Sequence, residues 1–168
     1  MRILIIAGAA ALVAGCGNSA NEKAQAAPTA AALQAGEYRL TWSDIEKSPS
    51  AEKAAASAKA APAVAAADFP ASACIATDGT IEPAAFGNTS DQCHMVNSYV
   101  REGTVNVQVG CAREGKGEVS QIASGSFTAA DSFTAKVETS TSFTGGGNYT
   151  MTRNLSAKRV GECTAKQS

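Results

Sequence analysis

Hydrophobic and polar residues alternate along much of the second half of the chain. Across residues 104–111 the odd positions hold Val, Val, Val and Cys, while the even positions hold Thr, Asn, Gln and Gly. Residues 133–143 and 149–157 repeat the pattern, which Arg153 interrupts. A period of two is typical of half-buried strands, and turn residues at 113–117, 129–131 and 145–147 separate the segments. The pattern predicts an all-β domain, an antiparallel meander that forms a curved sheet or a small barrel.

The first half of the chain contains one further candidate strand and a segment of a different kind. Residues 37–42 alternate and include Trp42, the only tryptophan, which favours a first strand. Ser48 and Pro49 then have the character of a helix start, with serine as the N-cap and proline in the first turn. Residues 50–67 contain mainly alanine, with no apolar side chain larger than Val64. We expect a short Ala-rich helical insertion that docks weakly on the domain.

The N-terminus is typical of an exported chain. Met1 and Arg2 precede an uncharged apolar run over residues 3–13, which is too short to span a membrane and has the length of a signal-peptide core. The following Val13-Ala14-Gly15-Cys16 resembles the lipobox of bacterial lipoproteins. That resemblance implies cleavage after residue 15 and acyl chains such as palmitate on Cys16, which together anchor a protein stably. The alternative is an ordinary secretory signal that happens to precede a cysteine.

The same resemblance predicts how the mature chain is organised. Gly17 follows Cys16 where an aspartate would resemble an inner-membrane retention signal, so we expect an outer-membrane lipoprotein that faces the periplasm. Residues 16–36 are mostly small and polar, which predicts a disordered tether. Residues 37–165 are then expected to form a single disulfide-stapled β domain.

Composition narrows the possible functions. Leu, Ile, Val and Phe together make up about 16% of the 168 residues, whereas alanine alone contributes 36. Such a chain supports one small domain and excludes a large enzyme with a deep aliphatic core. The formal net charge of −1 provides no basic surface for nucleic acid, so no nucleic-acid partner is expected.

Four cysteines remain for disulfides if Cys16 carries lipid. A three-residue loop over 101–103, with Gly103 in the left-handed conformation, would place Val100 opposite Thr104. Opposite residues in that hairpin sum to 204, and so do Cys93 and Cys111. This register predicts a Cys93–Cys111 bridge and, by elimination, a Cys74–Cys163 bridge. Free or metal-binding thiols are the alternative, but the chain contains no CxxC spacing.

Candidate catalytic residues are few and have simpler interpretations. His94 is the only histidine and falls on the polar side of its strand, so a solvent-exposed position is expected. Ser124 lacks the upstream glycine of a nucleophile elbow, and the glycines at 115–117 and 145–147 lack a phosphate-loop pattern. Arg153, Lys158 and Arg159 are interpreted as a solvated basic edge of the last strand. We therefore predict no catalytic residue, no metal site and no cofactor.

The order of these features resembles the bacterial domain-of-unknown-function family 3617 over roughly residues 36–164. The residues that support the resemblance are Trp42, Cys74-Ile75-Ala76-Thr77, Phe86, Cys93, Val107-Gln108-Val109-Gly110-Cys111, Gly125-Ser126-Phe127 and Arg159-Val160-Gly161-Glu162-Cys163. The resemblance implies an exported envelope protein and supplies no activity and no catalytic residues.

Two functions are consistent with these expectations. The first is a lipid-anchored, non-enzymatic envelope protein that acts by binding or structural contact with a partner. The alternative is a carrier that holds a small apolar ligand in a barrel or a clam-like sheet. In both cases the membrane is a partner through Cys16.

Overall fold

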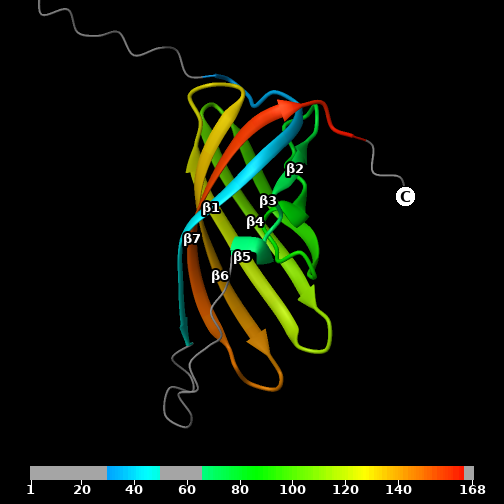
Figure 1. Cartoon of the computed structure of the whole chain (residues 1–168), viewed down its shortest axis with the longest axis vertical. Helices are drawn as coiled ribbons and strands as arrows, with labels where there is room; N and C mark the ends of the chain where they lie inside the picture. The colour runs from blue at the N-terminus through cyan, green and yellow to red at the C-terminus, as the bar shows by residue number, and fades with distance from the viewer. Residues whose placement is uncertain (1–29, 50–65, 165–168) are drawn as a thin grey trace, which may run out of the picture.

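A computed structural model describes residues 30–49 and 66–164, which form one antiparallel sheet of seven strands with two short 3-10 turns (Figure 1). The elements in chain order are β1 (Gly36–Pro49), η2 (Ala66–Asp68), β2 (Ser72–Ile75), η3 (Pro83–Ala85), β3 (Gln92–Arg101), β4 (Thr104–Arg113), β5 (Gly117–Ser126), β6 (Ser132–Phe143) and β7 (Tyr149–Gly161). The predicted all-β fold is confirmed.

The sheet is a curled half-barrel whose two edges do not meet. Its strand order is β2-β1-β7-β6-β5-β4-β3, so a meander of five strands is extended by β1 and β2 beyond β7. Residues 66–91, which include β2, η2 and η3, lie along the opening of the curl (Figure 1). We call residues 66–91 the strap. In a fully closed barrel the strands themselves would enclose the inner face. In this half-barrel the strap covers the part of the inner face that the strands leave open.

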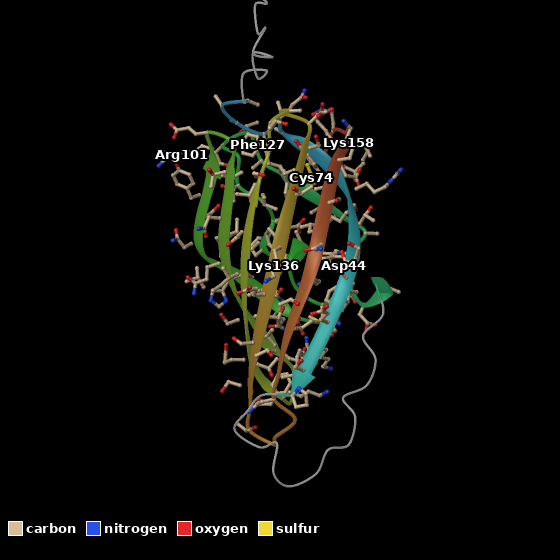
Figure 2. All side chains as sticks on the ribbon, turned by 90° about the vertical axis from the view of Figure 1, so that its left-hand side faces the viewer. Asp44, Cys74, Arg101, Phe127, Lys136 and Lys158 are labelled. Atoms are coloured by element: carbon tan, nitrogen blue, oxygen red, sulfur yellow. A yellow bond between two sulfur atoms is a disulfide. The ribbon has the colours of Figure 1, made fainter. Side chains whose placement is uncertain are left out.

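The alternation predicted from the sequence separates the two faces of the sheet. In β4 the side chains of Val105, Val107, Val109 and Cys111 are buried, while the residues between them are exposed or half-buried. The neighbouring strands continue both faces, and polar side chains such as Lys136 and Lys158 project from the outside (Figure 2). The core therefore lies on the concave face, between the sheet and the strap.

The first strand is longer than the sequence indicated. It runs through Ser48 and Pro49, which pair with Thr150 and Tyr149 of β7, so the predicted helix start is wrong. The long partner strand supplies hydrogen bonds that the Ser-Pro signal could not reveal. The register shifts between Ser43 and Glu46, and the remaining predicted insertion over residues 50–65 lies outside the described residues.

The β3–β4 hairpin reaches the predicted cysteine pairing by a different route. Its loop contains two residues, since Arg101 pairs with Thr104, and Val100 pairs with Val105 instead of Thr104. A register shift between Met95 and Asn97 then adds one residue to β3 and restores the expected alignment at Cys93 and Cys111. The short loop and the bulge offset each other, so the predicted Val100–Thr104 pair is wrong while the Cys93–Cys111 alignment is confirmed.

The end of the predicted tether belongs to the fold. Leu33 is buried in the core, and the backbone amides of Ala30 and Gln34 donate to the carbonyls of Thr128 and Ala130. The single large apolar residue of that segment therefore docks on the end of the half-barrel. The rest of the tether and the signal peptide lie outside the described residues.

The hairpin turn allows a direct test of its conformation. Glu102 and Gly103 both have positive φ, at 53° and 77°, as a type I′ turn requires. Because a glutamate side chain disfavours this region, we expect Glu102→Asn to raise the free energy of unfolding by about 0.5 to 1 kcal/mol. Urea denaturation measures the change. Glu114→Asn, in a turn position without positive φ, is the control, and equal effects of the two substitutions would contradict the turn assignment.

Candidate functional site

The candidate catalytic residues are not brought together. His94 and Ser124 are both exposed, opposite Gly110 and Asn106 respectively on the two sides of β4. Four residues along β4 separate those positions, about 13 Å at the usual strand rise, so no Ser–His hydrogen bond can form. Among the described residues, no group of three or more His, Cys, Asp or Glu side chains could hold a metal ion.

Both predicted cysteine pairs lie at disulfide distance, one with Cys74 inside the strap and the other with Cys93 two residues beyond its end. Cys74 in β2 is joined to Cys163 beyond β7, with their Cα atoms 5.7 Å apart. Cys93 at the start of β3 is joined to Cys111 of β4, with a Cα separation of 4.0 Å. Residues 75–92 therefore form a segment that is fixed covalently close to both of its ends.

The strap packs tightly against the second disulfide. A Cβ atom on Gly87 would lie 2.5 Å from the Cys93 sulfur and 3.5 Å from the Cys111 sulfur, so this position accepts glycine alone without a shift. Phe86, directly before it, is 1% exposed. The strap thus places an aromatic side chain and its backbone carbonyl deep in the concave face.

Arg153 is the unexpected residue of this face. The sequence placed it on a solvated edge, but it is 1% exposed, because β7 lies between β1 and β6 and position 153 points inward. The interpretation of Arg153 as part of an exposed basic group is therefore wrong. Lys158, by contrast, is exposed and bonds Asp131 at 2.5 Å.

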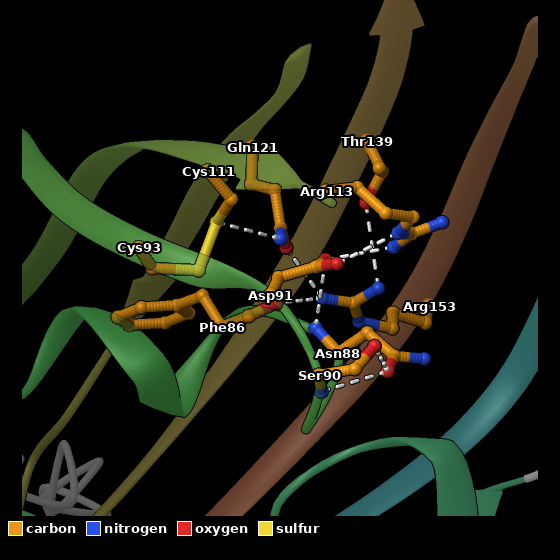
Figure 3. Close-up of a disulfide and its surroundings, with 10 residues drawn as sticks. All are labelled: Phe86, Asn88, Ser90, Asp91, Cys93, Cys111, Arg113, Gln121, Thr139 and Arg153. Atoms are coloured by element: carbon orange, nitrogen blue, oxygen red, sulfur yellow. Dashed lines mark hydrogen bonds and ion pairs between the residues drawn. A yellow bond between two sulfur atoms is a disulfide. The ribbon is translucent and has the colours of Figure 1, made fainter. Parts of the chain in front are cut away.

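The Arg153 guanidinium contacts neutral acceptors in the described part of the chain (Figure 3). It donates to the Gln121 side-chain oxygen at 2.6 Å, to the Thr139 hydroxyl at 3.4 Å and to the backbone carbonyl of Phe86. Its Nε atom is buried without a hydrogen-bond acceptor. The aromatic rings of Phe69 and Trp42 lie 4.0 and 4.6 Å from the guanidinium carbon. Aromatic faces stabilise a cation but do not neutralise it.

A second arginine nearby is paired differently. Arg113 makes two hydrogen bonds of 2.7 Å to the carboxylate of Asp91, whose side chain is completely buried (Figure 3). It also donates to the Tyr149 hydroxyl at 3.1 Å. The contact with Asp91 fastens the end of the strap to β4. The carboxylate and the Tyr149 hydroxyl raise the pKa of Arg113, although partial burial opposes that shift.

Burial acts on Arg153 with much less compensation. The loss of hydration lowers its pKa to about 10, and electrostatic interactions with Tyr149 and Asp91 oppose this shift only in part. The side chain still carries its proton at neutral pH. A buried cation without a carboxylate contact can hold an anion by charge and by its parallel N–H groups, but it cannot act as a general base near neutral pH.

Sequence reasoning missed both arginines, although a signal was present for each. Arg153 has the inward parity of Met151 and Leu155. Asp91 and Arg113 sum to 204, the register of the predicted Cys93–Cys111 pair, so extension of the hairpin by one inward position brings them together. Their charge favoured a prediction of solvent exposure, although their position in the alternation indicated the concave face.

A family model described as "Protein of unknown function (DUF3617)" matches residues 33–163. The chain belongs to this family. The match begins at the buried Leu33 and ends at Cys163, so it includes every strand, the strap and both cysteine pairs. No curated protein and no solved structure shows significant similarity to the chain.

The buried Asp91–Arg113 ion pair is expected to contribute much more to the free energy of unfolding than an exposed ion pair does. We expect Asp91→Asn to lower the free energy of unfolding by about 3 kcal/mol, since Arg113 would lose its charged partner in a desolvated site. The exposed Lys136–Glu138 pair supplies the control, because Glu138→Gln should change stability by less than about 0.5 kcal/mol. Urea denaturation of both variants makes the comparison, and similar losses would show that burial does not strengthen the Asp91–Arg113 contact.

Proposed function

We propose that the protein is an exported, lipid-anchored envelope protein that acts by binding and has no enzymatic activity. The observation that carries this proposal is the strap over the concave face, with one disulfide inside it and a second disulfide two residues beyond its end. Covalent staples of this kind persist in oxidising compartments such as the periplasm, and they suit a small domain with a thin core.

The proposed anchor rests on the sequence Val13-Ala14-Gly15-Cys16, which lies outside the described residues. No helix in residues 30–49 or 66–164 is long and apolar enough to cross a membrane. The acyl chains on Cys16 are proposed to attach the chain to the outer membrane, with the β domain in the periplasm.

The anchor is tested by metabolic labelling. The full chain, expressed in a bacterium supplied with an alkyne analogue of palmitate, should incorporate the label and separate with the membranes. Cys16→Ser should abolish the incorporation, because the acylated sulfur and the processed amine are both lost. The double variant Cys93→Ser, Cys111→Ser is the matched control and should remain labelled. Label that persists in Cys16→Ser would overturn the anchor.

A second candidate function is a carrier of a small apolar ligand. The observation that favours it is the largely apolar concave face that the strap covers, in which Arg153, Gln121 and Thr139 are the buried polar residues among those described. A described surface depression of about 260 Å³, between the turn at 78–80 and residues 98–101 of β3, is open and polar and does not support this function. A carrier would instead use the face beneath the strap.

Native mass spectrometry separates the two candidates. For the oxidised full chain taken directly from the bacterial envelope, a reproducible extra mass that leaves on denaturation would favour the carrier. A chain without added mass, recovered together with a cross-linked envelope partner, would favour the contact protein. A bare chain without a specific partner would contradict both forms of binding.

A further inference from the structure

The contacts of Arg153 show what the concave face is equipped to bind. We propose that the face beneath residues 76–91 is a closed binding site for an amphipathic anion, a single apolar chain that ends in a carboxylate or phosphate. The head group would take the place of the Phe86 carbonyl at Arg153. This inference rests on the carrier function proposed above and specifies its ligand.

The guanidinium of Arg153 has unused hydrogen-bonding capacity. Its Nη2 donates to the Phe86 carbonyl and to the Gln121 side-chain oxygen, whereas the adjacent Nε finds no acceptor among the described residues. A backbone carbonyl offers one oxygen, but a carboxylate or a phosphate offers two at the spacing of the Nε and Nη2 hydrogens. The strap therefore satisfies half of a site that an anion would satisfy completely.

The charge of Arg153 is not matched by the carboxylate that shares this region of the core. The buried carboxylate of Asp91 is held by two hydrogen bonds to Arg113. Arg153 is left with the neutral oxygens of Gln121, Thr139 and Phe86. A buried cation with neutral partners is less stable than one with an anionic partner. An anion that enters the site would therefore supply the opposite charge that Arg153 lacks among its hydrogen-bonding partners.

The strap itself has the amphipathic character of the proposed ligand. The Phe86 carbonyl accepts a hydrogen bond from Arg153, and the Phe86 side chain is buried in the core. Phe86 thus occupies the positions that we propose for the head group and the apolar chain of the ligand. Beneath the strap lie the inward side chains of the central strands, including Val107, Ala123 and Val137. This floor is apolar and matches an alkyl chain.

The cover can move without unfolding the sheet. Residues 76–91 are fixed near their ends by Cys74–Cys163 and Cys93–Cys111. The backbone hydrogen bonds described for this segment join strap residues to one another, as in Thr89 to Asp68 and Gly87 to Ala84. The Asp91–Arg113 ion pair fastens the end of this segment to β4. The part before Asp91 can swing outward as a loop while that ion pair, both disulfides and the ladder of β3 to β7 stay intact.

Trp42 provides a built-in reporter for the test. It is the only tryptophan of the chain, 8% exposed, and its ring lies 4.6 Å from the Arg153 guanidinium. The oxidised full chain, reconstituted in phosphatidylcholine vesicles, is titrated with decanoate, decyl phosphate and decanol, each below its aggregation limit. Acetate and inorganic phosphate are titrated in parallel.

We expect a saturable change in Trp42 emission with decanoate or decyl phosphate, at concentrations where decanol and the small anions produce none. The stronger of the two amphipathic anions identifies the head group. Arg153→Met should weaken the binding by about 10- to 100-fold, as expected for the loss of charged hydrogen bonds. Arg153→Lys should retain part of the binding, because lysine keeps the positive charge but lacks the paired, parallel N–H groups of the guanidinium. Arg101→Met, at an exposed arginine on β3, should bind like the native chain.

A second variant covers the possibility that Arg153→Met does not fold. Phe86→Leu keeps Arg153 and shortens the buried side chain of the cover, so the affinity for the amphipathic anion should increase. An unchanged or lower affinity in a folded Phe86→Leu protein would contradict displacement of the strap.

The remaining outcomes separate this inference from the proposed carrier. Equal binding of decanol and decanoate, unaffected at Arg153, would overturn head-group recognition while the carrier function stands. Equal responses to acetate and decanoate would indicate a small-anion site and overturn the apolar part. No response to any probe would overturn both the inference and the carrier function.

Discussion

An open sheet with an apolar concave face is the constraint on which the rest of this structure depends. The edge strands β2 and β3 do not pair with each other, so the inner face of the half-barrel needs a cover that the sheet cannot provide. The strap supplies buried side chains such as Phe69, Ile81 and Phe86 for this purpose. Its contribution to the core explains why a chain so poor in large aliphatic residues can still bury a continuous cluster.

The two disulfides follow from this requirement. The strap contains one four-residue strand and two 3-10 turns, and the rest of it is irregular. Its apolar contacts alone compensate poorly for the conformational entropy that this irregular part loses on docking. The Cys74–Cys163 bridge closes 89 residues and the Cys93–Cys111 bridge closes 18, so both restrict the unfolded chain. They also flank the segment that covers Arg153. The disulfides therefore keep the cover close to the sheet whether or not its central part is docked.

The sequence predicted the sheet well because alternation and burial express the same physical requirement. Residues 104–111 show this, since each odd position is buried on the concave face. The Cys93–Cys111 pairing was also predicted correctly, although two errors in the predicted hairpin offset each other. The predicted loop was one residue too long, and the prediction lacked the bulge near Val96, for which the local sequence gives no signal. Leu33 gave no signal because a single apolar residue has no period.

The candidate site was harder to predict because position and chemistry pointed in opposite directions. The parity of Arg153 indicated the core, but a charged side chain is rarely buried, and the hydrophobic pattern gave no reason to expect Phe69, Trp42 and Gln121 around it. These partners come from the strap and from two separate strands. Their convergence depends on the curl of the sheet and the path of the strap, neither of which is encoded within one local segment.

The cover and the buried charge are linked by one hydrogen bond, beside the stacking of the Phe69 ring on the guanidinium. The Phe86 carbonyl helps to hold the strap, and it is also the strap's hydrogen-bonding partner for Arg153. A stronger acceptor at this position would stabilise the closed face permanently, whereas an apolar residue in place of Arg153 would leave the carbonyl buried and unsatisfied. The hydrogen bond from the Arg153 guanidinium to the neutral Phe86 carbonyl lies between these two cases. It is strong enough to hold the strap on the concave face, and it is weaker than the hydrogen bonds that an anion would accept. The strength of closure and the capacity to exchange the cover for a ligand therefore depend on the same hydrogen bond.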